Sequence, residues 1–217
     1  MLALTACASG PRPAFEHALP GPALPWTHAT FDTTGGRFTF AIVSDLNGGE
    51  RRDVFALAVR QLASLRPELV MSVGDLIDGP TANADSLTRE WDDFDARARA
   101  MPAPFFRVGG NHDLTGDELK DVWRSRYGPT YYAFVYKQAL FLVLDTEDLS
   151  PERAREIFVA RTKAVQAAAE NQGGQDTLSY YRMQERATGD IGAEQAAYMQ
   201  RAVAEQAARD LERGKAL

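Results

Sequence analysis

Three short apolar runs in this 217-residue sequence are each followed by side chains that could bind a metal ion. The runs cover residues 38–44, 69–73 and 105–108, and the polar residues after them are Asp45, Asn47, Asp75, Asp78, Asn111, His112 and Asp113. Carboxylate and amide oxygens with an imidazole nitrogen suit divalent ions such as Mn, Fe or Zn. Aspartates gathered at one place would repel one another unless a cation lay between them. Two ions about 3.5–4 Å apart can hold the attacking and leaving oxygens of a displacement at phosphorus.

The segments between these runs predict how the polar side chains are positioned. Residues 53–65 and 86–101 carry apolar side chains at helical spacing. Strand, helix, strand, helix, strand predicts βαβ units and a parallel sheet. The first run, residues 38–44, is β-rich and apolar, which predicts a strand buried on both faces. Because ligands of such sheets bind beyond the carboxyl ends of the strands, we expect the three polar clusters to meet at one rim.

The rest of the chain predicts a hairpin and further helices. The hairpin strands are expected over residues 131–136 and 140–144, on either side of a short polar stretch. Helices are expected over residues 118–127, 151–170 and 193–213. The predicted fold class is therefore α/β, with a mainly parallel sheet and flanking helices.

The motifs around the polar residues resemble those of the calcineurin-like metallophosphoesterases. Gly-Asp-Leu-Ile-Asp at 74–78 and Gly-Asn-His-Asp at 110–113 match two motifs of that family. Asp-Leu-Asn at 45–47 stands where the family usually has Asp-x-His. Flanking tracts that also agree are residues 127–134, 140–146 and 191–195. The resemblance covers residues 36–212 and implies the N-terminal portion of a layered αββα domain.

The resemblance implies a centre of two divalent ions, Mn, Fe or Zn. Asp45 would bind the first ion, Asp75 would bridge both, and Asn111 would bind the second. Asn47 stands at the position of the family's histidine. Its amide oxygen could ligate an ion, or it could only satisfy loop backbone, and both alternatives stay open.

The implied reaction is hydrolysis of a phosphate mono- or diester by a hydroxide that the two metal ions activate. His112 would donate a hydrogen bond or a proton to the leaving oxygen. Asp113 would orient that imidazole and favour its protonated form. Asp78 would hold the loop of Asp75. The alternative is a tethered binding protein with a vestigial metal site and no catalysis, which Asn47 favours.

The C-terminal part departs from the family pattern. The family supplies further histidines downstream, whereas the two other histidines of this chain, His17 and His28, precede the first predicted strand. We therefore expect the domain, residues 36–217, to be incomplete at its C-terminus. A second sheet would be missing, the first sheet would be packed on one face only, and the activity would be impaired.

The N-terminus resembles a bacterial lipoprotein signal. Leu4-Thr-Ala-Cys7 is similar to a lipobox, in which the cysteine is lipidated, so residues 1–7 are interpreted as a signal-like segment. The Pro-rich residues 8–35 are interpreted as a tether. This predicts a periplasmic lipoprotein of the bacterial cell envelope. The six residues before Cys7 lack the basic and apolar parts of a full signal, so a cytoplasmic protein is the alternative.

The charge and the cysteine content of the chain limit the classes of partner that it could bind. The formal net charge is −6, which argues against nucleic acid, since a phosphate backbone needs a basic face. A single cysteine excludes an intrachain disulfide. The expected partners are a small phosphorylated substrate and, if Cys7 is modified, a membrane. The identity of the substrate and the oligomeric state stay open at this stage.

Overall fold

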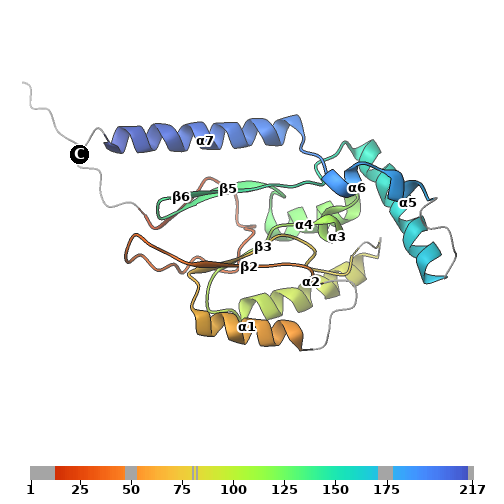
Figure 1. Cartoon of the computed structure of the whole chain (residues 1–217), viewed down its shortest axis with the longest axis horizontal. Helices are drawn as coiled ribbons and strands as arrows, with labels where there is room; N and C mark the ends of the chain where they lie inside the picture. The colour runs from red at the N-terminus through yellow and green to blue at the C-terminus, as the bar shows by residue number, and fades with distance from the viewer. Residues whose placement is uncertain (1–12, 47–52, 80, 82, 171–177, 215–217) are drawn as a thin grey trace, which may run out of the picture.

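The structure is a computed structural model that describes residues 13–46, 53–79, 81, 83–170 and 178–214. Its elements are β1 (Phe15–His17), β2 (Phe40–Val43), α1 (Val54–Leu65), β3 (Leu69–Ser72), α2 (Ala84–Arg99), β4 (Phe105–Phe106), α3 (Asn111–Leu114), α4 (Asp117–Tyr127), β5 (Tyr132–Tyr136), β6 (Ala139–Val143), α5 (Pro151–Ala169), η2 (Ser179–Arg182), α6 (Glu185–Thr188) and α7 (Ala193–Gly214). Figure 1 shows their layers: α7, the sheet of β5 and β6, the sheet of β2 and β3, and then α1 with α2. The predicted α/β class and the helix–sheet–sheet–helix layering are confirmed.

One sheet is parallel, as predicted, with the strand order β2-β3-β4. Its strand β2 is not buried on both faces, because Phe40 is 44% and Ile42 is 59% exposed. Ala41 and Val43, on the other face of the strand, pack against the hydrophobic core. The second sheet covers the exposed face only in part, and the ring of Phe40 meets Phe141 of β6 edge-on at 5.6 Å. The prediction of a doubly buried first strand is therefore wrong.

The second sheet is antiparallel, with the order β1-β5-β6. Phe134 of β5 stacks on Phe106 of the parallel sheet, with ring centroids 4.3 Å apart, and on Phe141 at 4.7 Å. Such rings bury a large apolar area and fix the distance between the layers. The expectation of a missing second sheet is therefore wrong, because the hairpin and an N-terminal strand build that second sheet beside the parallel one.

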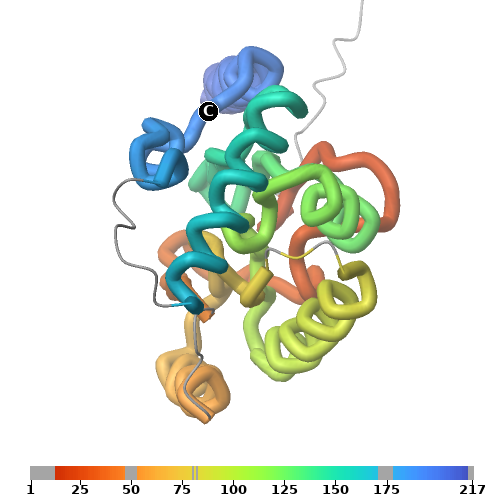
Figure 2. Tube along the Cα trace, turned by 90° about the vertical axis from the view of Figure 1, so that its right-hand side faces the viewer, coloured from red at the N-terminus to blue at the C-terminus, as the bar shows by residue number. Residues whose placement is uncertain are grey.

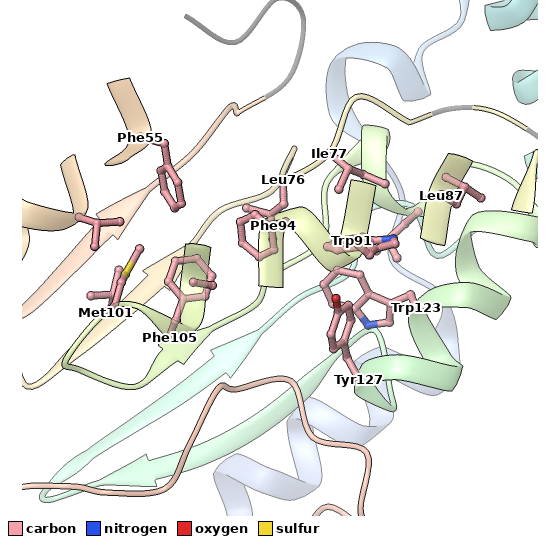
Figure 3. Packing of buried hydrophobic residues seen from close by; sticks show 14 of the residues in the cluster. Phe55, Leu76, Ile77, Leu87, Trp91, Phe94, Met101, Phe105, Trp123 and Tyr127 are labelled. Carbon is pink, nitrogen blue, oxygen red and sulfur yellow. The ribbon is translucent and has the colours of Figure 1, made fainter. Parts of the chain in front are cut away.

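The other face of the parallel sheet is covered by α1, α2 and α4. Figure 3 shows the cluster beneath them, in which Trp91 of α2 meets Trp123 and Tyr127 of α4, and Phe94 of α2 meets Phe105 of β4. Trp91 and Trp123 pack edge to face with centroids 5.6 Å apart, and both are fully buried. The helical spacing seen in the sequence thus corresponds to a real core face.

The N-terminal segment belongs to the folded domain. Phe15 of β1 pairs with Tyr136 of β5, and Trp26 is only 5% exposed, between the two sheets. The backbone N–H of Arg107 donates to the carbonyl of Pro25 at 2.7 Å. The tether prediction is therefore wrong for residues 13–35, whereas residues 1–12, with Cys7, lie outside the described residues. In the part of the chain that the structure describes, no helix is long and apolar enough to cross a membrane.

Replacing Trp26 tests whether this segment holds the sheets together. We expect Trp26→Ala to lower the free energy of unfolding by about 3–5 kcal/mol, because a buried indole is lost and a cavity is left. Urea denaturation followed by circular dichroism measures it. Val165→Ala, at a position on α5 that is 57% exposed, serves as the control and is expected to change little. Equal stability of Trp26→Ala and the unmodified chain would show that the segment is loosely attached.

Candidate metal and phosphoester site

The loops after β2 and β3 touch through their backbones. Asp45 lies two residues beyond the end of β2 and Asp75 three residues beyond the end of β3, and each has a positive φ of 58°. The N–H of Asp45 donates to the carbonyl of Gly74 at 3.3 Å, and that of Leu46 donates to the carbonyl of Asp75 at 2.8 Å. A left-handed conformation is costly for a residue other than glycine, and these bonds hold both aspartates in it.

Two glycines allow the third loop to approach the second. A Cβ atom on Gly74 would lie 2.7 Å from the Cα of Gly110. A Cβ atom on Gly110 would collide with the side-chain Oδ1 of Asp75 and would lie 2.7 Å from its backbone nitrogen. The Gly-Asp and Gly-Asn-His-Asp motifs therefore need glycine where two backbones meet.

The carboxylate of Asp113 joins these two loops. Its Oδ2 accepts from the N–H groups of Asp75 at 2.7 Å and Gly110 at 2.8 Å. Its Oδ1 accepts from Leu76 at 2.9 Å and Ile77 at 3.3 Å. The side chain is fully buried. Burial raises the pKa of Asp113 to about 7, and the N–H donors of Gly110, Leu76 and Asp75 oppose that rise because they favour the carboxylate.

His112 has a different partner from the one expected. Its ring Nδ1 lies 2.6 Å from the backbone carbonyl of Asp78, to which it donates, while its backbone N–H donates to Oδ1 of Asp75 at 3.1 Å. The expected orientation of this imidazole by Asp113 is therefore not the arrangement in the structure, since Asp113 is occupied by backbone donors. A backbone carbonyl at Nδ1 leaves Nε2 as the nitrogen that can face a ligand.

A polar cleft of about 540 Å³ opens beyond the strand ends. Figure 2 views the molecule from the side where α5 lies, with α7 and α1 at opposite ends. The predicted residues that line the cleft are Asp45, Asp75 and Asn111. Among the described residues His112 and Asp113 are not part of this lining, and Asn47 lies outside the described residues.

Later segments supply cleft residues that the sequence reasoning missed. These are Glu147 after β6, Arg161 of α5 and Arg186 of α6. Arg153 of α5 holds α6 in place through two contacts with Glu185, at 2.7 and 2.8 Å. The sequence held one indication of this. Arg161 follows Ile157 by four residues and so lies on the apolar face of its helix, where a charged side chain is unusual.

Arg161 lies against the third motif. Its side chain is buried, and Nη1 donates to the backbone carbonyl of Asn111 at 2.7 Å. The carboxamide of Asn111 fits its surroundings with the oxygen toward the guanidinium, since both nitrogens facing it are donors. In that orientation Oδ1 accepts from Nη2 at 2.8 Å and from Nη1 at 2.9 Å.

The side chains of the cleft that could ligate a metal fit one divalent ion better than two. Asp45 and Asp75 offer the hard carboxylate oxygens that suit such an ion. The ligand oxygen predicted for a second ion, on Asn111, faces Arg161 instead. Within the described ranges, no three His, Cys, Asp or Glu side chains form a metal-binding group. Any ion held here would therefore need ligands from water, substrate or residues outside those ranges.

Together these features define an α/β protein with a polar cleft at the carboxyl ends of its parallel strands. The family model of the calcineurin-like phosphoesterases matches residues 38–182. This match spans more than half of the chain, and the chain belongs to that family, whose chemistry is phosphoester hydrolysis. Comparisons with curated proteins and with solved structures gave no significant match.

The role of Asp113 as a clamp between loops can be tested with Asp113→Asn at pH 8, above the pKa of the carboxyl. The amide nitrogen would face N–H donors, and a buried unsatisfied group costs about 1–3 kcal/mol. We expect a decrease of that size in the free energy of unfolding, measured by urea titration. Asp117→Asn is the control, because Asp117 forms an exposed ion pair with Arg155. If both variants were as stable as the parent chain, the clamp would contribute nothing.

Proposed function

We propose that this protein hydrolyses a phosphate ester, a mono- or diester of a small molecule, with the help of a divalent cation. The observation that supports the proposal is the composition of the cleft. Asp45 and Asp75 line it together with Arg161 and Arg186. Carboxylates suit a hard cation, and guanidinium groups bind phosphoryl oxygens through charge-assisted hydrogen bonds.

Each residue has a role that follows from its place. Asp45 and Asp75 hold the cation, and Mn, Fe or Zn would there polarise a phosphoryl oxygen and lower the pKa of a water molecule. Arg186, which lines the same cleft, binds the phosphate. His112 is anchored through Nδ1 and does not line the cleft, so its Nε2 would donate a proton to the leaving oxygen of a substrate that reaches beyond that lining. Asp113 acts at a distance, because it keeps Asp75 and Gly110 in place.

The second candidate is a binding protein with a vestigial site. The contact between Arg161 and the Asn111 carboxamide favours it, since that oxygen is taken from the ligand set of the family. Such a protein would bind phosphorylated molecules in the same cleft without hydrolysing them. Measured turnover separates the two candidates.

Asp75→Asn tests the enzyme proposal. The amide still accepts the N–H of His112 but carries no charge to hold a cation. With Mn²⁺ added, we expect hydrolysis of p-nitrophenyl phosphate or of bis(p-nitrophenyl) phosphate to fall at least roughly a hundred-fold, since metal assistance is worth several kcal/mol. Removing metal with EDTA should lower the activity of the parent chain similarly.

The matched control is Asp92→Asn, which removes a carboxylate paired with Arg126 on α4. It is expected to retain full activity. If the unmodified chain hydrolyses neither ester with Mn²⁺ but still binds phosphate, the binding alternative holds. Equal activity in Asp75→Asn and Asp92→Asn would place the chemistry elsewhere.

We also propose that the protein is a lipoprotein of the bacterial cell envelope, anchored through Cys7. Seven residues lie between Cys7 and the start of β1 at Phe15, so the anchor would hold the domain within roughly 30 Å of the membrane. We expect Cys7→Ser to release the protein from the membrane fraction, and mass spectrometry to find a lipid on the N-terminal peptide of the parent. Ser9→Ala should stay in the membrane fraction. An unmodified N-terminus would support the cytoplasmic alternative.

A further inference from the structure

Arg161 is a buried cation placed directly at the family's third motif. It comes from α5, far along the chain from that motif, and only 4% of the residue is exposed. Besides the Asn111 carbonyl, its Nη1 lies 3.4 Å from Oγ1 of Thr115. The same residue lines the cleft beside Asp45 and Asp75. A buried guanidinium is costly unless its donors are satisfied and its charge is balanced.

The surroundings of Arg161 provide that balance. Oε2 of Glu147 accepts from Thr115 at 3.0 Å, and the charge of Arg161 opposes the rise in the pKa of Glu147 that burial causes. Oγ1 of Thr115 also lies 2.6 Å from the Asn111 carbonyl oxygen, and its single proton serves one of these two acceptors at a time. A threonine hydroxyl and a backbone carbonyl thus contact the guanidinium, and a carboxylate lies beyond the hydroxyl. Because an arginine side chain does not lose its proton in a protein, this positive charge is permanent.

With the carboxamide in this orientation, Oδ1 of Asn111 contacts Arg161 and is not available to a metal ion. A carbonyl oxygen has two lone pairs, and Oδ1 uses both for Nη1 and Nη2 of Arg161. The same oxygen cannot then also ligate an ion. The motif residue that the family resemblance assigns to the second ion therefore serves as a hydrogen-bond acceptor for an arginine.

We propose that the guanidinium of Arg161 takes the place of the second metal ion, so that the centre holds one divalent cation, at Asp45 and Asp75, beside a fixed organic cation. This inference rests on the proposed phosphoester hydrolysis. It explains which groups would balance the negative charge of the phosphoryl group. A guanidinium presents a planar fork of N–H donors that matches a phosphoryl group. Because Nη1 is occupied by Asn111, Arg161 offers a phosphoryl oxygen its remaining N–H groups and its permanent charge, and it takes part in no covalent step.

The number of metal ions is the first test. The full chain is titrated with Mn²⁺ by isothermal calorimetry, and bound manganese is then counted by elemental analysis after gel filtration. We expect one ion per chain. Two ions per chain would overturn this inference and leave the proposed function standing, whereas no bound ion would overturn both.

Phosphate binding is the second test, and it does not depend on turnover. With Mn²⁺ present, Arg161→Met is expected to bind inorganic phosphate at least roughly tenfold more weakly, as for lost hydrogen bonds between charged groups. Its Mn²⁺ affinity should be equal or higher, because a neighbouring positive charge is gone. Arg155→Met is the matched control on the same helix, since Arg155 is exposed and pairs with Asp117. It should match the parent in both measurements.

Unchanged phosphate affinity in Arg161→Met would overturn the inference. A loss of Mn²⁺ binding would overturn it too, because that is the result expected of a residue that only supports the fold. A thermal melt establishes that the variant is folded. If it is not, Arg161→Lys replaces it, because lysine keeps the charge but not the fork. Several-fold weaker phosphate binding at unchanged Mn²⁺ stoichiometry is then expected, and affinity equal to that of the parent would contradict the proposal.

Discussion

The buried carboxylate of Asp113 is the interaction on which the candidate site depends. It gathers N–H groups from the loop after β3 and from the loop after β4, so the two loops behave as one unit. Neither loop forms regular hydrogen bonds at these positions, and buried N–H groups need acceptors. Asp75 is fixed in a left-handed conformation by this arrangement, with its side chain at the cleft. The last residue of the Gly-Asn-His-Asp motif therefore supports the cleft without lining it.

The two sheets supply the rigid support behind these loops. The parallel sheet brings the ends of β2 and β3 to one rim, and the antiparallel sheet covers it through stacked aromatic rings, such as Phe106 on Phe134. The N-terminal segment completes this layer through Trp26. A site built on packed strands is held more precisely than one on free loops. The sheets that support the candidate site thus depend on the N-terminal segment as well as on the central strands.

Electrostatics distinguish this cleft from a plain metal site. Two carboxylates, Asp45 and Asp75, lie in the same cleft as two guanidinium groups, those of Arg161 and Arg186. The overall charge of the chain is negative, so these cations are a local feature that attracts an anion against the general field. This is the arrangement expected for a pocket that binds a phosphoryl group beside a cation.

Sequence patterns by themselves determined the fold class, the parallel strands, the hairpin and the long helices, because each depends on local periodicity and turn residues. They also determined that Asp45, Asp75 and Asn111 would share one rim. The partners of buried polar groups were decided only by tertiary structure. That Asp113 accepts from backbone donors, that the Asp78 carbonyl anchors His112, and that Arg161 holds Asn111 all depend on contacts between distant segments. Hydrogen bonds of this kind leave no periodic signal in a sequence, since they depend on how loops meet after the core has packed.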